Sequence, residues 1–353
     1  MKKVNVGLIS HDYFPIIGGQ GVYVSELIKN LKLNKSVKTK IFSTTNRKNS
    51  FKITSRNNFY FSLKFNFILN GLINKYGLGM IHLQGGPGGI FLIKKPKVPA
   101  IYTVHHSYYK KSKISKNPLY KFLFFIEKLS YKKASKIIVP SRDIYFDLIN
   151  AYGIDEKKIV YIPEGVDTKI FSKKNYRKIK DSLIFVGRLN KIKGLRNLIM
   201  SLKFVSKKYP SIRLYIVGEG PEIKILKKLI RRKNLKNNVK FFGKLDKEEI
   251  DKLYNQVNLS VLPSYFEGFG LSALESVASG TPVIVTKQCG VSDIIKKNNF
   301  GIVIDSNSPK EISKAILSFF KGDFKKKKLK ISKNLSWKEI AKKTLEVYKN
   351  EIK

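Results

Sequence analysis

Cysteine, histidine and acidic residues are all scarce in this sequence, and each shortage narrows the possible functions. The single cysteine, Cys289, can form no internal disulfide, which suits a reducing compartment. The four histidines include no His-x3-His pair and no supporting acidic pattern of the kind that holds zinc. We therefore expect no metal ion and no other cofactor.

Long apolar runs are also missing. The basic start at Met1–Lys3 is followed by an apolar run of about six residues, which predicts a first β-strand and not a signal peptide. No stretch approaches the roughly 18 uninterrupted apolar residues of a transmembrane helix. We therefore expect a cytoplasmic protein.

The charge is strongly one-sided, because 70 basic residues face 25 acidic ones and the formal net charge is +45. A lysine-rich proteome would explain the lysines, although it does not explain the shortage of aspartate and glutamate. A field this positive would attract nucleic acid, an anionic membrane or phosphorylated ligands. The composition leaves both explanations open.

The length of 353 residues predicts two domains, and 42% hydrophobic residues predict that they are folded. Apolar runs alternate with helical periods, which indicates an α/β protein with two doubly wound parallel sheets. Ile162–Asp181 contains Pro163 and Gly165 and is the predicted connection. The predicted strands are Val4–Ser10, Val37–Ser43, Met80–Leu83, Ala100–Val104, Lys136–Val139, Leu183–Val186, Arg213–Val217, Val239–Phe242, Leu259–Leu262 and Val283–Val285.

Two glutamates stand eight residues apart in the stretch Ser264–Thr286. Glu267 precedes a Gly-Phe-Gly turn, and Glu275 lies in an apolar helical run. The turn at Phe269–Leu271 predicts a helix N-terminus, whose unpaired amides and partial positive charge suit an anionic ligand. The two carboxylates could then bind sugar hydroxyls beside a phosphate. By themselves they would also fit the acid/base pair of a glycoside hydrolase.

Glycines and cations follow several predicted strands. Gly187 would let a ligand approach the backbone, and Arg188 and Lys193 could neutralise a diphosphate in place of a metal. Gly18 and Gly19 open a predicted helix and could bind a phosphate or simply form a tight turn. Gly218 lies in a Gly-x-Gly pattern that is weak evidence alone. The two cations could also be ordinary surface residues.

These motifs together resemble those of retaining glycosyltransferases of family 4, which have the GT-B fold. The resemblance rests on Glu267 and Glu275 as a Glu-x7-Glu motif, on Phe185–Leu195 as F-V-G-R-L-x(3)-K-G-L, and on Val217–Pro221 as V-G-x-G-P. In the N-terminal half Thr103–His105 matches T-x-H. Ile162–Phe171 matches I-x-N-G-V-D-x(3)-F, except that Glu164 replaces the usual asparagine.

The resemblance implies two Rossmann-like domains, residues 1–165 for the acceptor and residues 166–335 for the donor, which face a central cleft. A last helix, residues 336–353, would cross back to the N-terminal domain. It implies a metal-independent hexosyltransferase whose donor is a nucleotide-diphosphate sugar and whose acceptor is a glycan or a polyprenyl- or lipid-linked molecule. The residues it assigns to catalysis are His105, Glu267, Arg188 and Lys193. The residues that the resemblance assigns to donor binding are Gly18, Gly19, Gly187, Arg188, Lys193, Gly218, Phe269, Gly270, Leu271 and Glu275.

The helix predicted around Leu119–Lys133 has two unlike faces. A stripe at helical spacing predicts the core side, namely Leu119, Phe122, Leu123, Ile126 and Leu129. On the other side Tyr120, Phe124 and Tyr131 lie among lysines, which suits a membrane interface. A helix buried on both sides is the alternative. With the positive charge, this pattern predicts peripheral association with the cytoplasmic face of an anionic membrane.

Two other functions fit parts of the sequence. A nucleotide-sugar epimerase shares the GT-B fold and would act on the donor without an acceptor. Nucleic-acid binding is suggested only by the charge, which is spread over both halves without a recognition module, so we expect no specific nucleic-acid partner.

Overall fold

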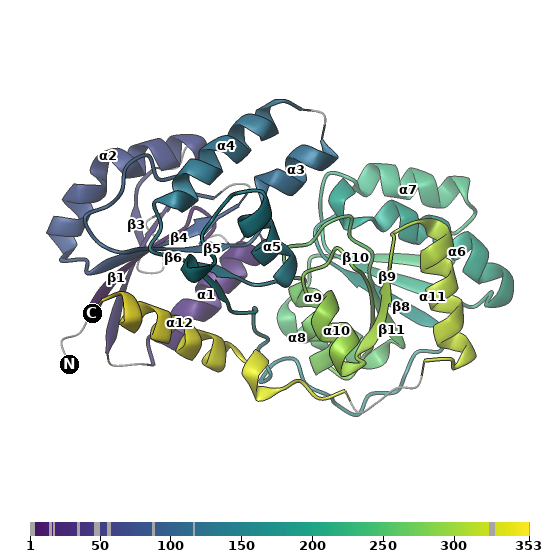
Figure 1. The fold of residues 1–353 in the computed structure, drawn as a ribbon. Helices are drawn as coiled ribbons and strands as arrows, with labels where there is room; N and C mark the ends of the chain where they lie inside the picture. Colours follow the sequence, from purple (N-terminus) through teal and green to yellow (C-terminus); the bar gives the residue numbers. More distant parts are fainter. Residues whose placement is uncertain are drawn as a thin grey trace. The chain divides into compact units, whose positions relative to one another are not determined.

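Every strand pairing in the part of the chain that the structure describes is parallel, and the strands form two separate sheets. The computed structural model describes residues 4–13, 16, 18–33, 36–45, 50–54, 58–86, 89–115, 117–324 and 329–352 (Figure 1). Residues 1–164 and 337–353 form unit 1, and residues 165–336 form unit 2. The sequence predicts a solvated turn or short basic segment at Lys325–Lys330, which lies largely outside the described residues.

Unit 1 contains a sheet of seven strands in the order β3-β2-β1-β4-β5-β6-β7. The order reverses between β1 and β4, which makes the carboxyl ends of these strands the expected ligand position of a doubly wound sheet. The strands are β1 (Val4–Ile9), β2 (Val37–Ser43), β3 (Ser50–Lys52), β4 (Met80–Gly85), β5 (Ala100–Val104), β6 (Lys136–Val139) and β7 (Ile159–Tyr161). The helices are α1 (Gly19–Leu31), α2 (Asn58–Tyr76), α3 (Tyr108–Ile114), α4 (Leu119–Lys132), α5 (Arg142–Asn150), the 3-10 turn η1 (Glu156–Lys158) and α12 (Trp337–Glu351).

Unit 2 repeats this arrangement with the order β10-β9-β8-β11-β12-β13, which reverses between β8 and β11. The strands are β8 (Ser182–Val186), β9 (Arg213–Val217), β10 (Val239–Gly243), β11 (Leu259–Leu262), β12 (Val283–Thr286) and β13 (Gly301–Ile304). The helices are α6 (Leu195–Lys208), α7 (Ile223–Arg232), α8 (Lys247–Gln256), α9 (Leu271–Ala278), α10 (Ser292–Asn298) and α11 (Pro309–Lys321), with the 3-10 turns η2 (Lys191–Lys193) and η3 (Lys333–Leu335).

The ten predicted strands are all present, within two residues of the predicted ends. They were visible in the sequence because a parallel strand is buried on both faces and therefore forms a continuous apolar run. The short edge strands β3, β7 and β13 were missed, since three or four residues show little pattern. The lysine-rich stretch Tyr108–Lys113 suggests a basic loop from its sequence, but Tyr108–Ile114 is a helix. The Ser107 side chain accepts a hydrogen bond from the Lys110 amide and caps this helix.

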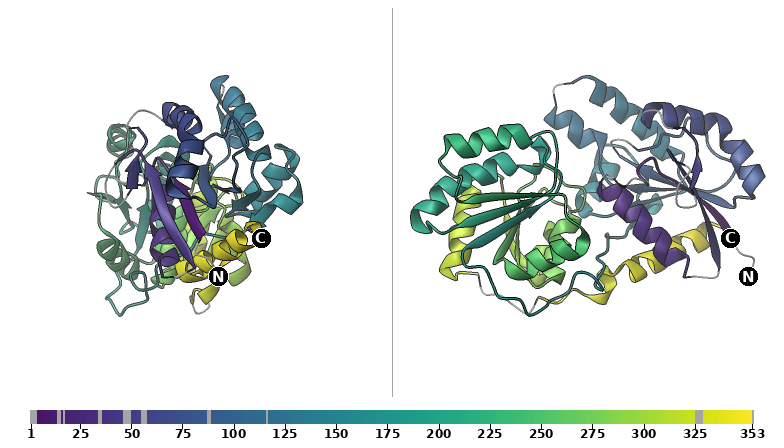
Figure 2. Two further views of the ribbon diagram at one scale, coloured as in Figure 1. Left: turned by 90° about the vertical axis from the view of Figure 1, so that its left-hand side faces the viewer. Right: turned by 180° about the vertical axis from the view of Figure 1, so that it is seen from behind.

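Helix α12 packs beside α1 within unit 1 (Figures 1 and 2). The Tyr348 hydroxyl lies 2.6 Å from His82 Nδ1, and His82 Nε2 lies 2.8 Å from Thr103 Oγ1. Burial lowers the pKa of His82 to about 3, so this imidazole is neutral. His82, which lies on β4, therefore has a structural role: it joins the last helix to β5.

The predicted orientation of α4 was wrong. Leu119, Phe122 and Leu129 were expected in the core, but they are 51%, 56% and 41% exposed. Tyr131 was expected at a membrane surface and is 1% exposed. Its hydroxyl donates a 2.9 Å hydrogen bond to the buried carboxylate of Glu127. A buried tyrosine hydroxyl usually needs such a partner, and the same carboxylate also accepts a hydrogen bond from the Tyr152 hydroxyl, 25 residues away. Helical spacing shows that Glu127 and Tyr131 share a face of α4, but it does not show the contact with Tyr152 that lies on the inner side.

Glu127 makes a testable contribution to the pH dependence of stability. Its carboxylate also accepts hydrogen bonds from the Tyr152 hydroxyl and the Tyr108 amide, yet burial raises its pKa to about 7 from an ordinary 4.5. Between these two values the unfolded chain has lost the proton that the folded chain keeps, so the free energy of unfolding falls as the pH rises. From pH 5 to pH 7.5 the loss is about 2 kcal/mol.

Urea unfolding of the wild type and Glu127→Gln at both pH values tests this. The glutamine variant lacks the titration, so the stability advantage of the wild type should shrink by about 2 kcal/mol between pH 5 and pH 7.5. An advantage that is the same at both pH values would contradict the assignment.

Candidate active site

In unit 2, an ion pair joins residues that follow the two strands at which the sheet order reverses. Lys193 lies in η2 after β8, and Glu267 lies in the loop after β11. The Lys193 ammonium contacts Glu267 Oε2, and the two side chains are 21% and 12% exposed. The pair is therefore partly shielded from water, which strengthens it relative to a surface pair.

The backbone around Glu267 is held by three hydrogen bonds, one to the η2 turn and two to the segment Gln288–Gly290. The Tyr265 amide donates to the Ile192 carbonyl at 2.8 Å, the Glu267 amide to the Gln288 carbonyl at 3.2 Å, and the Gly290 amide to the Glu267 carbonyl at 2.9 Å. Gly194 allows the η2 turn to approach this loop. Its φ is +69°, and a Cβ at this position would lie 2.0 Å from the Pro263 carbonyl oxygen.

The N-terminus of α9 offers free hydrogen-bond donors next to this loop. Among the described residues, the amides of Phe269, Gly270 and Leu271 donate no hydrogen bond. No side chain caps the helix either. Unpaired amides at a helix N-terminus suit phosphate oxygens, which is the arrangement that the sequence predicted for these residues.

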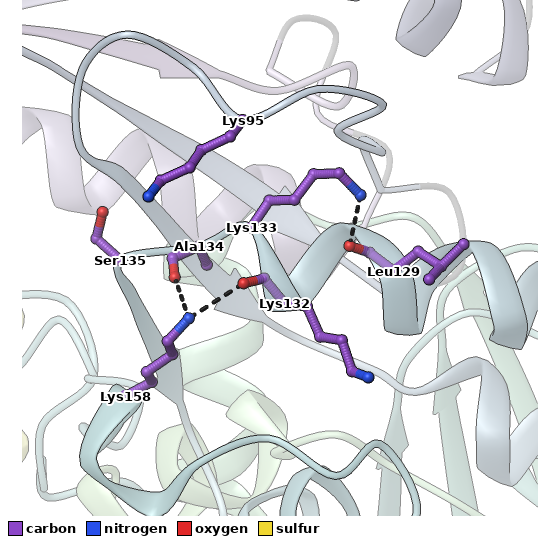
Figure 3. A pocket seen from close by; sticks show the side chains of 7 residues that line it. All are labelled: Lys95, Leu129, Lys132, Lys133, Ala134, Ser135 and Lys158. Carbon is purple, nitrogen blue, oxygen red and sulfur yellow. Dashed lines mark hydrogen bonds between the residues drawn. The ribbon is translucent and has the colours of Figure 1, made fainter.

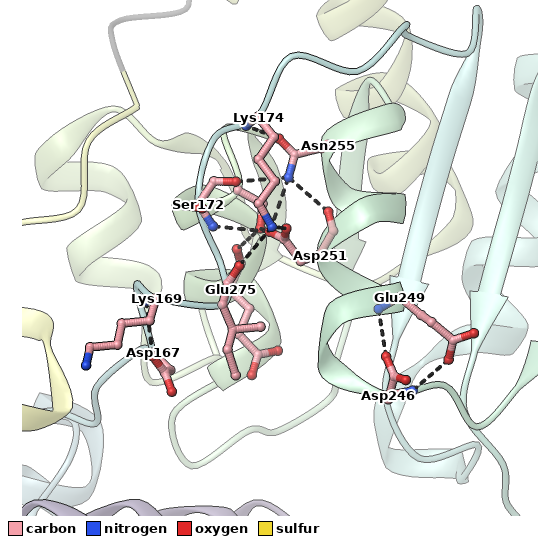
Figure 4. Close-up of polar contacts among 11 residues, drawn as sticks. Asp167, Lys169, Ser172, Lys174, Asp246, Glu249, Asp251, Asn255 and Glu275 are labelled. Atoms are coloured by element: carbon pink, nitrogen blue, oxygen red, sulfur yellow. Dashed lines mark hydrogen bonds and ion pairs between the residues drawn. The ribbon is translucent and has the colours of Figure 1, made fainter.

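Glu275 lies on α9, and the far end of this helix is anchored by a buried aspartate that the sequence analysis missed. Asp251 Oδ1 accepts hydrogen bonds from the Ser279 hydroxyl at 2.6 Å and from the Ser172 amide at 3.1 Å (Figure 4). Lys174 adds an ion pair. The signal in the sequence is an acidic residue on the same side of α8 as Tyr254 and Asn255, three and four positions away.

Arg188 and Gly218 have different environments. The Arg188 side chain is exposed and makes no hydrogen bond or ion pair with any residue that the structure describes, so it is available to a ligand. Gly218 serves packing, because a Cβ there would lie 2.0 Å from the Gly187 carbonyl oxygen. The two glycines let the ends of β8 and β9 lie against each other.

In unit 1, His105 follows β5 and is 4% exposed. Its Nδ1 lies 3.1 Å from Glu164 Oε1, and its Nε2 lies 2.8 Å from Gln84 Oε1. Both ring nitrogens therefore have partners within unit 1. Gln84 was not predicted as part of a site, although it lies at the carboxyl end of β4, where the strand order reverses.

The glycine loop before α1 already contains an anion. The Asp12 carboxylate accepts hydrogen bonds from the Gly18 amide at 3.1 Å and from the Gly21 amide at 3.2 Å. Asp12 thus stabilises the helix N-terminus where the sequence predicted a phosphate beside Gly18 and Gly19. A ligand phosphate would have to displace this carboxylate.

A hollow of about 470 Å³ lies at the C-terminal end of α4 and contains none of the candidate residues (Figure 3). Lys158 Nζ donates to the carbonyls of Lys132 and Ala134, both at 3.1 Å, and Lys133 Nζ donates to the Leu129 carbonyl at 2.8 Å. These lysines satisfy the last carbonyls of the helix. Nowhere in the described chain do three histidine, cysteine, aspartate or glutamate side chains form a group that could hold a metal ion.

Comparison with known proteins agrees with the two-unit architecture. The model of the family "Glycosyl transferases group 1" matches residues 166–344, and that of "Glycosyltransferase Family 4" matches residues 17–170. Sucrose-phosphate synthase from Thermosynechococcus elongatus superimposes with a TM-score of 0.81 at 21% identity over 99% of both chains. Anabaena HepE in complex with UDP-glucose gives a TM-score of 0.76 at 16% identity, over 98% of this chain and 99% of HepE.

Curated relatives show the same family. An uncharacterised glycosyltransferase of Methanocaldococcus jannaschii is 29% identical over 248 residues, which are 65% of this chain and 63% of that protein. Alpha-monoglucosyldiacylglycerol synthase of Acholeplasma laidlawii is 26% identical over 261 residues, 67% of this chain and 65% of the synthase. The chain thus matches somewhat less than two thirds of each of these two relatives.

The two doubly wound units and the two family matches together define a glycosyltransferase of the GT-B fold. Within that class, the chain belongs to the family 4, or group 1, glycosyltransferases.

The anchoring role of Asp251 can be measured by unfolding. Asp251→Ala leaves several buried donors without an acceptor, so we expect unit 2 to lose about 3 kcal/mol of stability. Asp246→Ala on the same helix is the matched control: this exposed residue caps α8 in a capping box, and its loss should cost about 1 kcal/mol. Unfolding of both variants in urea is measured by circular dichroism. Equal losses of stability would contradict the role given to Asp251.

Proposed function

We propose that this protein is a retaining hexosyltransferase that uses a nucleotide-diphosphate sugar without a metal ion. The observation that carries the proposal is the joint presence in unit 2 of the Lys193–Glu267 ion pair and the free amides at the N-terminus of α9. A carboxylate that can accept hydrogen bonds from sugar hydroxyls thus lies in the same loop as donors suited to phosphate. That HepE, a structural neighbour, was solved with UDP-glucose supports a nucleotide sugar as the donor.

Each candidate residue is assigned one part of the donor. Arg188, which is exposed and unpaired among the described residues, and the amides of Phe269–Leu271 neutralise the diphosphate. Lys193 holds Glu267 in place, and Glu267 binds hydroxyls of the transferred sugar. Glu275 binds the ribose hydroxyls. In unit 1, His105 is assigned a hydrogen bond to a sugar hydroxyl.

During transfer the bond between the sugar C1 and the diphosphate oxygen breaks, and its electron pair leaves with the diphosphate. The acceptor hydroxyl forms the new bond to C1 on the same face, and its proton passes to the leaving phosphate. Because Glu267 is already paired with Lys193, we assign it to hydroxyl binding and not to nucleophilic attack. The accumulating negative charge on the phosphate is what Arg188 and the α9 amides stabilise.

The acceptor is proposed to be a lipid-linked molecule or a glycan at the cytoplasmic face of an anionic membrane. The support is the outer face of α4, where Leu119, Phe122, Phe125 and Leu129 are 51%, 56%, 57% and 41% exposed. Lys121 and Lys132 are also exposed on this helix, and the lysine-lined hollow of Figure 3 adjoins Leu129. An apolar stripe flanked by lysines suits an interface of acyl chains and anionic headgroups. None of the described helices is long and apolar enough to cross a membrane.

The donor site is tested by Arg188→Ala. A panel of UDP-, GDP- and ADP-sugars is first screened by thermal shift, and the product formed from the stabilising donor is identified by mass. We expect Arg188→Ala to lower kcat/KM by about 100-fold or more, because the charge it stabilises is largest in the transition state. Arg188→Lys should recover only part of the loss, since an ammonium cannot bind two oxygens side by side.

Arg213→Ala is the matched control for this variant, because Arg213 is an exposed arginine at the opposite, amino end of a strand in the same sheet. It should leave turnover unchanged. Near-wild-type turnover of Arg188→Ala, with its fold intact, would refute the assignment.

Membrane association is tested by co-sedimentation with phosphatidylglycerol-containing vesicles at moderate salt. Phe122→Ser with Phe125→Ser removes two exposed rings from α4, and we expect binding to weaken about tenfold or more. Phe204→Ser is the control, because Phe204 is similarly exposed, at 51%, on α6 of unit 2. If the wild type does not bind the vesicles, or if Phe204→Ser weakens binding as much as the double variant, the outer face of α4 is not the membrane-binding surface.

A further inference from the structure

We infer that Glu164 is a positioning residue that keeps the proton of His105 on Nδ1 and leaves Nε2 as a hydrogen-bond acceptor. The inference rests on the proposed function, because it assigns the ligand group that His105 meets. It concerns a residue in which this chain differs from the motif it resembles, since Glu164 stands where asparagine is usual.

The first step follows from the chemistry of a carboxylate. Glu164 Oε1 lies 3.1 Å from His105 Nδ1, and the two side chains are 6% and 5% exposed. An ionised carboxylate has no hydrogen to give, so the hydrogen on this contact belongs to Nδ1. An asparagine amide could either donate or accept there, and it would leave the tautomer of the imidazole undetermined.

The second step concerns the other ring nitrogen. With Gln84 Oε1 facing His105 Nε2 at 2.8 Å, the Gln84 amide nitrogen is buried and has no hydrogen-bond partner. The oxygen and nitrogen of an amide have nearly the same shape and are distinguished by their partners. Exchanging them lets the Gln84 amide donate to Nε2, which gives one buried N–H a partner and requires Nε2 to be unprotonated. The imidazole is then neutral, with its lone pair on Nε2.

The ring is also held by aromatic contacts. Tyr23 of α1 meets His105 edge to face, with ring centroids 4.8 Å apart, and Trp337 of α12 meets Tyr23 in the same way at 5.7 Å. The Tyr23 hydroxyl lies 3.2 Å from Thr103 Oγ1. The imidazole therefore has little freedom to turn over and exchange its two nitrogens.

Glu164 and Trp337 both lie at a boundary between the two units along the chain. Glu164 is the last residue of unit 1 before the chain enters unit 2, and Trp337 is the first residue after it returns. One contacts His105 directly, and the other does so through Tyr23. The orientation of His105 is thus set by the two residues at which the chain changes units.

An unprotonated Nε2 determines which kind of ligand group His105 can bind. A ligand that replaces Gln84 at Nε2 has to donate a hydrogen, and among the groups of a sugar diphosphate and its acceptor a sugar hydroxyl meets this requirement. A phosphate or carboxylate oxygen has no hydrogen to donate to an unprotonated Nε2. We therefore assign His105 to a sugar hydroxyl and not to the diphosphate.

The proton positions can be read from nitrogen NMR shifts of histidine-labelled full-length protein. The chain has only four histidines, and His105→Asn identifies the signals of His105. At pH 7.5 we expect Nδ1 to have the shift of a protonated nitrogen and Nε2 that of a bare one. An imidazolium pattern, or the proton on Nε2, would overturn the inference whether or not a donor has been found.

Glu164→Gln tests the cause. Its amide can donate or accept, so we expect the two nitrogen shifts of His105 to move toward each other as both tautomers become populated. Unchanged shifts in this variant would show that Glu164 does not set the tautomer. Glu26→Gln is the control, because Glu26 is similarly buried, at 7% against 5%, but lies on α1, where its carboxylate is 3.8 Å from the Lys29 ammonium.

Activity provides a second readout once the donor is known. We expect Glu164→Gln to lower kcat about tenfold while KM for the donor changes less than about twofold, because a mispositioned hydrogen bond matters most in the transition state. A rise in KM alone would overturn the positioning role. If Glu164→Gln changes the nitrogen shifts of His105 but leaves kcat unchanged, Glu164 sets the tautomer and the proposed role of His105 in transfer is wrong.

Discussion

The Lys193–Glu267 ion pair depends on most of the architecture of unit 2 and therefore shows how that unit forms a site. Its two residues follow β8 and β11, which become neighbours only because the strand order reverses between them. Parallel strands bring their carboxyl ends to one edge, so loops that are 74 residues apart in the chain meet there. Gly194 lets the η2 turn approach the Pro263 carbonyl, and three backbone hydrogen bonds hold the loop of Glu267.

Around this pair, the structure separates residues that hold the site together from residues that remain available to a ligand. Asp251 secures the end of α9, and Gly218 allows two strand ends to touch. Arg188 and the first amides of α9 have no partner among the described residues. In unit 1 the balance is different, since Asp12 occupies the N-terminus of α1 and both nitrogens of His105 are engaged. Unit 2 therefore presents open donors for an anion, whereas unit 1 presents a preformed network that a ligand would have to enter.

The outer face of α4 shows why a correct periodicity can still predict the wrong orientation. Helical spacing identified two unlike faces, and either could have faced the core. The buried Glu127 carboxylate accepts hydrogen bonds from Tyr131 and Tyr152, which draws the tyrosine side inward and leaves Leu119, Phe122 and Leu129 outside. The face predicted for a membrane surface is therefore the inner one, and the proposal of such a surface rests on the opposite, exposed residues of this helix.

By itself the sequence determined the class, the ten main strands and the positions of the motif residues, because buried parallel strands, glycine turns and a Glu-x7-Glu spacing are local patterns. Helix α3 and the short strands β3, β7 and β13 were missed, since a single serine cap or a strand of three or four residues leaves little pattern to detect. Only the tertiary structure decided which charges pair, that Asp12 fills the glycine loop, that Asp251 anchors α9 and that Glu164 meets His105. These contacts join residues between 6 and 79 positions apart, and their partners are chosen by burial and hydrogen-bond satisfaction across the fold, which no local pattern encodes.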